Sequence, residues 1–192
     1  MVAKPSHGSL TRKPLMPVEA VNEKAPDEFR LSRLNIFLFD FNQARRFSGY
    51  ILRRKLHAVK NPHAKAKLVH AAFNTSLIVS YSRPFHKSND TAGVRVSLRK
   101  AVQAVLTDGD EIALHNRVID MRDQTFAHSD AEAHEIEGFN YDGSTVQIYK
   151  FAFAPLTRDE TRLLSTMIKK WIDYVEKLRS VLKQPAEKNR AL

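Results

Sequence analysis

The helical architecture is most evident in the stretch of residues 27–58, DEFRLSRLNIFLFDFNQARRFSGYILRRKLHA. Its apolar side chains recur at steps of three and four residues, which is the spacing of one face of an α-helix. The sequence therefore predicts a long amphipathic helix that begins near Asp27, a residue able to cap it, and continues to about Ala58. The apolar face consists of Phe29, Leu31, Leu34, Phe37, Leu38, Phe41, Ala44 and Phe47.

Three further helices are expected after the break at Pro62. Apolar spacing predicts the second helix over residues 63–82 and a short third helix over residues 96–106. The fourth begins at Asp108 or Asp110, because either side chain can cap the first turn.

The pattern changes to alternation over residues 134–153, where apolar and polar side chains take turns as in a β-strand. The stretch YDGS, residues 141–144, is a turn signal in the middle of this segment, which therefore predicts a β-hairpin. Thr157 and Glu160 then form a capping box that opens a long C-terminal helix.

We therefore expect an all-α fold, an up-and-down bundle of four to five helices with a small β-hairpin inserted before the C-terminal helix. The helical domain is predicted over residues 27–183, with the hairpin at about 134–153. Residues 1–26 contain four prolines, scattered charge and no apolar period, which predicts a disordered basic tail. Residues 184–192 are expected to form a polar tail.

The composition is that of a globular protein from a reducing compartment. Hydrophobic residues make up 43% of the chain, and the absence of cysteine excludes disulfides and thiolate metal sites. No apolar run approaches the ~20 residues that span a bilayer, and no apolar segment follows the basic N-terminus as in a signal peptide. We expect a cytoplasmic protein with no membrane partner and no cofactor.

The net charge of +10 is unevenly distributed along the chain. Ten Lys or Arg and no Asp or Glu lie between Phe41 and Asn89, whereas ten acidic residues and only two arginines lie between Thr107 and Asp142. A basic surface favours polyanions, nucleic acid above all, although the two segments can also pair with each other inside one domain or across a dimer. The candidate RNA-binding residues are Arg45, Arg46, Arg53, Arg54 and Lys55.

The stretch HNRVIDMRDQTFAHSD, residues 115–130, holds the candidate catalytic residues Arg122, Asp123 and His128. An arginine stays charged and an imidazole exchanges a proton near neutral pH, a combination that can cleave a phosphodiester. The helical period places Arg122 on the apolar face of its helix. Six residues of straight helix turn through about 600°, so Arg122 and His128 would point about 120° apart. The reach of the arginine, a helix end or a second subunit has to bring them together.

The string RDQTFAHSD, residues 122–130, resembles the Arg-x(4–6)-His motif of the HEPN superfamily, and most of all its abortive-infection and phage-defence branch. The resemblance implies a helical domain that is a metal-independent ribonuclease, often a toxin. It also implies a homodimer with an antitoxin or nucleotidyltransferase partner. His128 would then be the general acid or base, Arg122 would stabilise the phosphate, and Asp123 would orient one of them. The hairpin is absent from the minimal bundle of this superfamily and would be an insertion.

Three other interpretations stay open. The domain can be a non-catalytic interaction module that binds a nucleotide or a protein partner, with Arg122 in a structural ion pair and His128 capping the helix end. His128, Asp130 and His134 can bind zinc or manganese, although their spacing matches no helix-face pattern. His115, on the same face as Arg122, is either a buried structural histidine or part of the cleft.

Overall fold

A computed structural model of the protein describes residues 26–61, 65–86, 97–123, 134–141, 144–151 and 155–188. Most of these residues are helical, so the helical class predicted from the sequence is confirmed. The predicted tail lies outside the described residues up to residue 25. In chain order the elements are α1 (Asp27–Arg53), η2 (Leu56–Ala58), α2 (Lys65–Ser82), η3 (Arg83–Phe85), η4 (Leu98–Ala101), α3 (Val102–Val105), α4 (Gly109–Met121), β1 (His134–Tyr141), β2 (Ser144–Phe151) and α5 (Arg158–Lys188), where η denotes a 3-10 helix.

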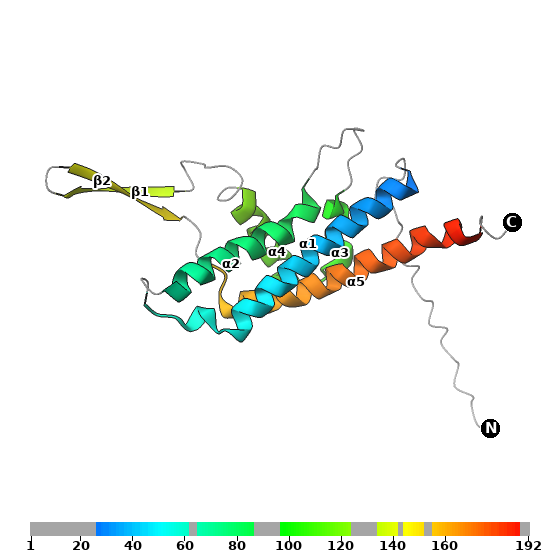
Figure 1. The fold of residues 1–192 in the computed structure, drawn as a ribbon, viewed down its shortest axis with the longest axis horizontal. Helices are drawn as coiled ribbons and strands as arrows, with labels where there is room; N and C mark the ends of the chain where they lie inside the picture. The colour runs from blue at the N-terminus through cyan, green and yellow to red at the C-terminus, as the bar shows by residue number, and fades with distance from the viewer. Residues whose placement is uncertain are drawn as a thin grey trace, which may run out of the picture.

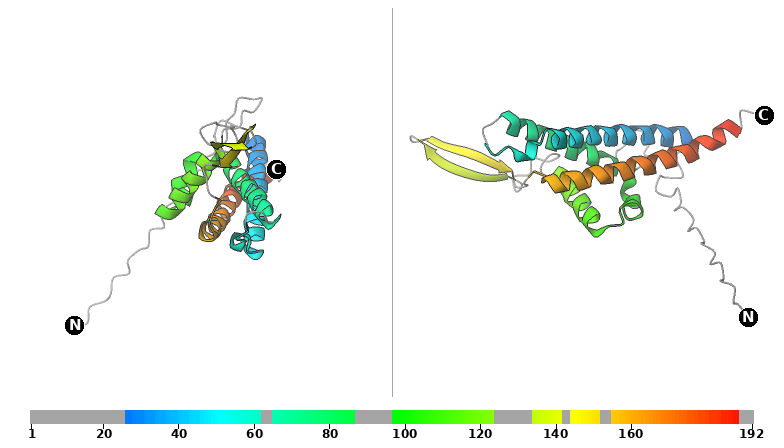
Figure 2. Two further views of the ribbon diagram at one scale, coloured as in Figure 1. Left: turned by 90° about the vertical axis from the view of Figure 1, so that its left-hand side faces the viewer. Right: turned by 90° about the horizontal axis from the view of Figure 1, so that it is seen from below.

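The three long helices α1, α2 and α5 form the body of the molecule (Figure 1). α1 packs against both of the others and runs opposite to them, which gives the up-and-down arrangement (Figures 1 and 2). α1 begins at Asp27 as predicted but ends at Arg53, because Lys55 adopts a left-handed backbone with φ 51° that a continuing helix cannot contain. The 3-10 turn η2 occupies the rest of the predicted first helix.

An aromatic cluster forms the centre of the core. Phe41 of α1 stacks on Trp171 of α5, with ring centroids 6.0 Å apart and planes 11° from parallel. Phe85 packs edge-on against Trp171 at 4.9 Å, and Tyr81 lies against Phe85 at 5.3 Å. All four side chains are buried, so this cluster fixes α1, the end of α2 and α5 against one another.

α5 begins with the predicted capping box. The backbone N–H of Thr157 donates to Glu160 Oε2 at 2.7 Å, and the N–H of Glu160 donates to Thr157 Oγ1 at 3.2 Å. Just before it, the N–H of Leu156 donates to the buried Asn74 Oδ1 of α2 at 3.2 Å. The helix continues to Lys188, past the predicted end of the helical domain at residue 183.

α4 packs against both α5 and α2 and is held to α5 by two ion pairs. Lys170 Nζ donates to both carboxylate oxygens of the buried Glu111, at 2.6 and 2.8 Å, and Arg117 pairs with Glu160. Asp108 caps the helix by accepting from the N–H of Asp110 at 2.8 Å, so the first of the two predicted caps is the one used.

The short third helix differs from the prediction. The segment 98–105 is a 3-10 turn, η4, followed by a single α-helical turn, α3, and it starts at Ser97, whose Oγ accepts from the N–H of Arg99. In the segment predicted as a hairpin, β1 and β2 pair antiparallel from His134 opposite Phe151 to Tyr141 opposite Ser144. Among the described helices, none combines the length and the apolar character that a bilayer crossing requires.

Candidate active site

Arg122 and Asp123 lie directly after α4, where the chain continues in a wider π-type turn. The buried face of α4 is centred on Leu114, Val118 and Met121 rather than on the arginine. Arg122 lies beside this face with 28% of its side chain exposed, so the predicted position on the apolar stripe is only partly correct. The guanidinium therefore reaches solvent, which a phosphate-binding arginine requires.

The carboxylate of Asp123 contacts both the guanidinium of Arg122 and the imidazole of His86. Arg122 Nη1 donates to Asp123 Oδ1 at 2.9 Å, and His86 Nε2 lies 3.2 Å from the same oxygen. The His86 nitrogen is at ion-pair distance but is not aligned for a hydrogen bond, and within the described part of the chain it has no hydrogen-bond partner. Arg122, Asp123 and His86, named here the Arg–Asp–His cluster, connect the end of α4 to the end of η3.

Three hydrogen bonds outside the cluster hold η3 and His86 in place. Arg83 Nη1 donates to the buried Asp40 Oδ1 of α1 at 3.3 Å. Ser97 Oγ donates to the carbonyl oxygen of Phe85 at 2.9 Å, and the N–H of His86 donates to Arg83 O at 3.1 Å. The backbone that carries His86 is therefore fixed from both sides.

Burial lowers the pKa of His86 below its ordinary value of 6.5. The positive charge of Arg122 lowers this pKa as well, the charge of Asp123 raises it, and the charge of Arg99 lowers it further. The net direction is down, so the His86 imidazole is neutral at pH 7.

The sequence does not identify His86 as a site residue, because 36 positions separate it from Arg122 and no motif spacing links the two. The signal that the sequence offers is its position two residues after Pro84, just past the predicted end of the second helix. A histidine at a helix end is common, so this signal alone does not identify a site.

The five predicted RNA-binding residues all lie at the end of α1 or in the turn after it, and all five side chains are exposed. One of them, Arg54, lies over the ring of Tyr50 at 5.8 Å. The cations whose charges act on His86 are Arg122 and Arg99, and neither is on α1. These five residues, named here the basic strip, are thus exposed as predicted for a surface that binds RNA. The cations near the Arg–Asp–His cluster are Arg99 and Arg122, which do not belong to the basic strip.

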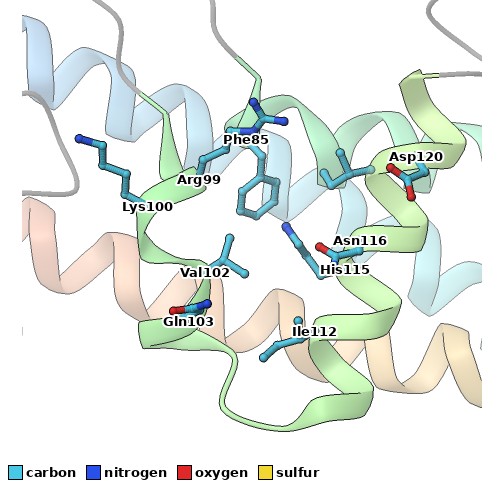
Figure 3. Close-up of a pocket in the computed structure, with 10 residues that line it drawn as sticks. Phe85, Arg99, Lys100, Val102, Gln103, Ile112, His115, Asn116 and Asp120 are labelled. Atoms are coloured by element: carbon cyan, nitrogen blue, oxygen red, sulfur yellow. The ribbon is translucent and has the colours of Figure 1, made fainter.

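A groove of about 750 Å³ lies between η4–α3 and α4 (Figure 3). One wall carries Arg99 and Lys100, and the other carries Asn116 and Asp120, with aliphatic side chains such as Ile112 between them. Neither Arg99 nor Lys100 takes part in an ion pair with any described residue. These two cations are therefore available to an anionic ligand.

The groove lies beside the elements that carry the Arg–Asp–His cluster, although none of the three cluster residues lines it. Phe85 and Asp120 lie at the same end of the groove, away from Gln103 (Figure 3). Phe85 directly precedes His86, and Asp120 lies one helical turn before Asp123. Arg99, on the basic wall, is the residue whose charge acts on both His86 and His115.

His115 is both buried and part of the groove lining, so the two interpretations of it are compatible. Its Nδ1 lies 2.9 Å from the hydroxyl of Tyr81, and only 5% of the residue is exposed. Burial, and then the charge of Arg99, lower the pKa of His115 to about 4. The imidazole is therefore neutral at pH 7 and cannot hold a phosphate by charge.

His128 and Asp130 lie outside the described residues, and His134 lies on β1. In the described ranges, no three metal-binding side chains come together. Comparisons of the chain with protein-family models, curated proteins and solved structures find no match.

Proposed function

We propose that this protein is a metal-independent endoribonuclease of the HEPN kind, in which Arg122 stabilises the scissile phosphate and His128 acts as general acid or base. The observation that carries the proposal is the partly exposed Arg122 side chain, whose guanidinium is held by Asp123 at the end of a helix in an α-helical bundle. An oriented, permanently charged arginine suits a phosphoryl group whose equatorial oxygens gain charge in the transition state.

The groove supports RNA as the substrate. A single RNA strand with one phosphate on Arg122 could continue past Arg99 and Lys100. Neither of these two side chains forms an ion pair with a described residue, so both can bind backbone phosphates. The exposed basic strip at the end of α1, with Arg53 and Arg54, offers a second region for the RNA backbone. Phosphate contacts of this kind give affinity and position but no sequence preference.

The proposal includes a homodimer, because a second subunit can supply the histidine that a straight helix would direct away from Arg122. An antitoxin or nucleotidyltransferase partner and a role in phage defence follow from the same resemblance. Sedimentation of the full chain at micromolar concentration should give the mass of a dimer. The mass of a monomer would contradict an active site formed by two subunits.

The decisive experiment is RNA cleavage without metal. We expect the full chain to cut RNA in the presence of a chelator, and His128→Ala and Arg122→Ala each to slow cleavage by roughly a hundredfold or more. Arg162→Ala is the matched control, because Arg162 pairs with Asp159 on the exposed face of α5, away from the cluster. Intact RNA after long incubation with folded wild-type protein would refute the nuclease.

A non-catalytic interaction module is the second candidate, and one observation favours it. Asp123 joins Arg122 to His86 and so ties α4 to η3, which is a structural role that needs no substrate. In that case Arg122→Ala lowers stability or partner binding and has no effect on RNA. Measuring unfolding and cleavage on the same variant separates the two functions.

A further inference from the structure

The outward side of α1 carries an exposed apolar pair. Phe39 is 60% exposed and Ile36 is 44% exposed, and the two side chains lie one helical turn apart. In the described part of the chain, two other large apolar side chains are exposed to this extent, Leu68 on α2 and Val181 on α5. Large apolar side chains that lie together in a polar surface mark a contact with another protein.

Ile36 and Phe39 are the centre of a longer row of residues along α1, named here the outer stripe. Its members recur at steps of three and four residues, so they share one side of the helix, and none of them is buried. The outer stripe consists of Glu28, Ser32, Ile36, Phe39, Gln43 and Arg46. The buried Phe41 lies on the other side of α1, against Tyr81 of α2 and Trp171 of α5. α1 itself lies on the opposite side of the body from α4 (Figure 2).

The outer stripe is complementary to a second copy of itself. It is acidic at its start, where Glu28 lies, apolar at its centre and basic at its end, where Arg46 lies. When two copies run antiparallel and cross between Ile36 and Phe39, each isoleucine meets the phenylalanine of the other copy. Glu28 and Arg46 are about nine residues, roughly 14 Å of helix, on either side of that crossing. The Glu28 carboxylate therefore lies opposite the partner's Arg46.

Charge selects this antiparallel direction. A parallel pair would bring the basic ends of both α1 helices together, and like charges across an interface repel. The helix dipoles also favour the antiparallel pair, because opposite partial charges then lie at each end. Neither Glu28 nor Arg46 forms an ion pair with any residue in the described ranges, so both can pair with a second copy.

We propose that the outer stripe is the dimerisation surface of this protein, and that its partner is a second copy of the chain with the two α1 helices antiparallel. The inference goes beyond the proposed function, since it does not depend on cleavage, and it names a surface for the homodimer. α4 and Arg122 of both copies then lie on the outer sides of the dimer (Figure 2). Because the apolar centre is small, we expect a dimer at micromolar rather than nanomolar concentration.

The test is sedimentation of the full chain over a range of concentrations, for wild type and for Phe39→Glu. The variant places a carboxylate from each copy in the apolar centre, so we expect the dissociation constant of the dimer to rise at least about tenfold. Leu68→Glu is the matched control, because Leu68 is an even more exposed apolar side chain outside the outer stripe. It should dimerise like wild type.

Charge reversal tests the antiparallel direction and does not need Phe39→Glu. Glu28→Arg alone and Arg46→Glu alone each place like charges opposite each other, so each variant should dimerise less strongly than wild type at low salt. Mixing the two variants restores opposite charges at both ends of the contact. Energy transfer between differently labelled copies should therefore show a mixed dimer that forms about as readily as the wild-type dimer.

The results separate this inference from the proposed function. Monomeric wild-type protein overturns the inference. A dimer that Phe39→Glu leaves intact overturns it too, and shows that the contact lies elsewhere, as an active site formed by two subunits requires. Two charge variants that do not associate when mixed overturn the antiparallel pairing. A dimer through the outer stripe that leaves RNA intact supports this inference and refutes the ribonuclease alone.

Discussion

His115 shows how a single residue of the motif region can serve the core. Its imidazole is fixed between Tyr81, which lies at hydrogen-bond distance from Nδ1, and Phe85, whose ring centroid is 4.6 Å away. Burial of a polar ring is tolerated here because the ring stays neutral and has a partner. The same burial makes the fold sensitive to acid.

We expect acid to destabilise the protein through His115. The folded-state pKa of His115, about 4, is below the ordinary value of 6.5, so the unfolded chain binds the proton more readily. The stability from the neutral ring is complete above pH 6.5 and is lost as the pH falls from 6.5 to 4, by roughly 3 kcal/mol.

Denaturant unfolding at pH 7 and pH 4.5 measures this loss. His115→Gln cannot titrate, so its free energy of unfolding should depend less on pH over this interval than that of the wild type. An equal pH dependence in both proteins would show that His115 is not the group responsible.

At the scale of elements, the fold is secured by polar contacts at helix ends and crossings. The capping box starts α5, Asn74 holds the chain just before it, and the Glu111–Lys170 pair fixes α4 across α5. Each contact joins segments far apart in the sequence or satisfies donors that the helix leaves free.

Thr157→Ala should destabilise the fold by about 1 kcal/mol, because the N–H of Glu160 loses the oxygen that caps it. Thr166→Ala is the control, since Thr166 is exposed in the interior of α5, where its hydroxyl bonds only the preceding turn. Thermal or denaturant unfolding measures both. A larger loss in Thr166→Ala would contradict the capping role.

Lys170→Met should cost roughly 3 kcal/mol, because it leaves the buried carboxylate of Glu111 without its partner. The value is at the lower end for a buried pair, since 39% of the Lys170 side chain is exposed. Adding Glu111→Gln should recover most of the loss, because the buried charge is then gone. If the double variant is no more stable than Lys170→Met, the pair does not carry this energy.

The helices and their caps could be predicted from the sequence because they depend on local spacing. Asp108 and the Thr157–Glu160 box cap their helices as predicted, whereas Asp27 is the first residue of α1 and pairs with Arg30 instead of capping the helix. The end of α1 could not be predicted, since the left-handed backbone at Lys55 has no signature in a basic, non-glycine residue. The predicted helix over residues 96–106 is present only as the 3-10 turn η4 followed by the single α-helical turn α3.

The candidate site could be predicted only where it is contiguous in sequence. Arg122 and Asp123 were found by their motif, whereas His86 and Arg99 come to the site through the packing of η3 and η4 against α4. This packing depends on how the helices cross, and no residue spacing encodes that. For the same reason the charge distribution along the sequence indicates the basic strip of α1 but not Arg99 and Lys100, which form no ion pair with any described residue.

At the scale of the whole molecule, the described residues include two separate exposed basic regions, the end of α1 and the wall of the groove. We expect the groove to contribute more to RNA binding, because Arg99 on its wall is close enough to the Arg–Asp–His cluster for its charge to act on His86. Arg99→Gln with Lys100→Gln should weaken binding of single-stranded RNA at least tenfold and lower the salt dependence by about one unit of slope.

Arg53→Gln with Arg54→Gln is the matched comparison, since it removes the same two charges from the exposed end of α1. Titration of a labelled RNA at several salt concentrations measures both pairs. A greater loss from the α1 pair would place the RNA on the strip predicted from the sequence and not along the groove.

The stack of Phe41 on Trp171 also has a consequence for synthesis of the chain. More than two thirds of the sequence separates the two residues, so α1 leaves the ribosome long before α5 exists to cover it. At ordinary elongation rates that interval is roughly ten seconds, during which Leu34, Phe37 and Phe41 have only the segments before α5, chiefly α2 and η3, as partners. The nascent protein, rather than the finished one, is therefore the form most open to aggregation and to capture by chaperones.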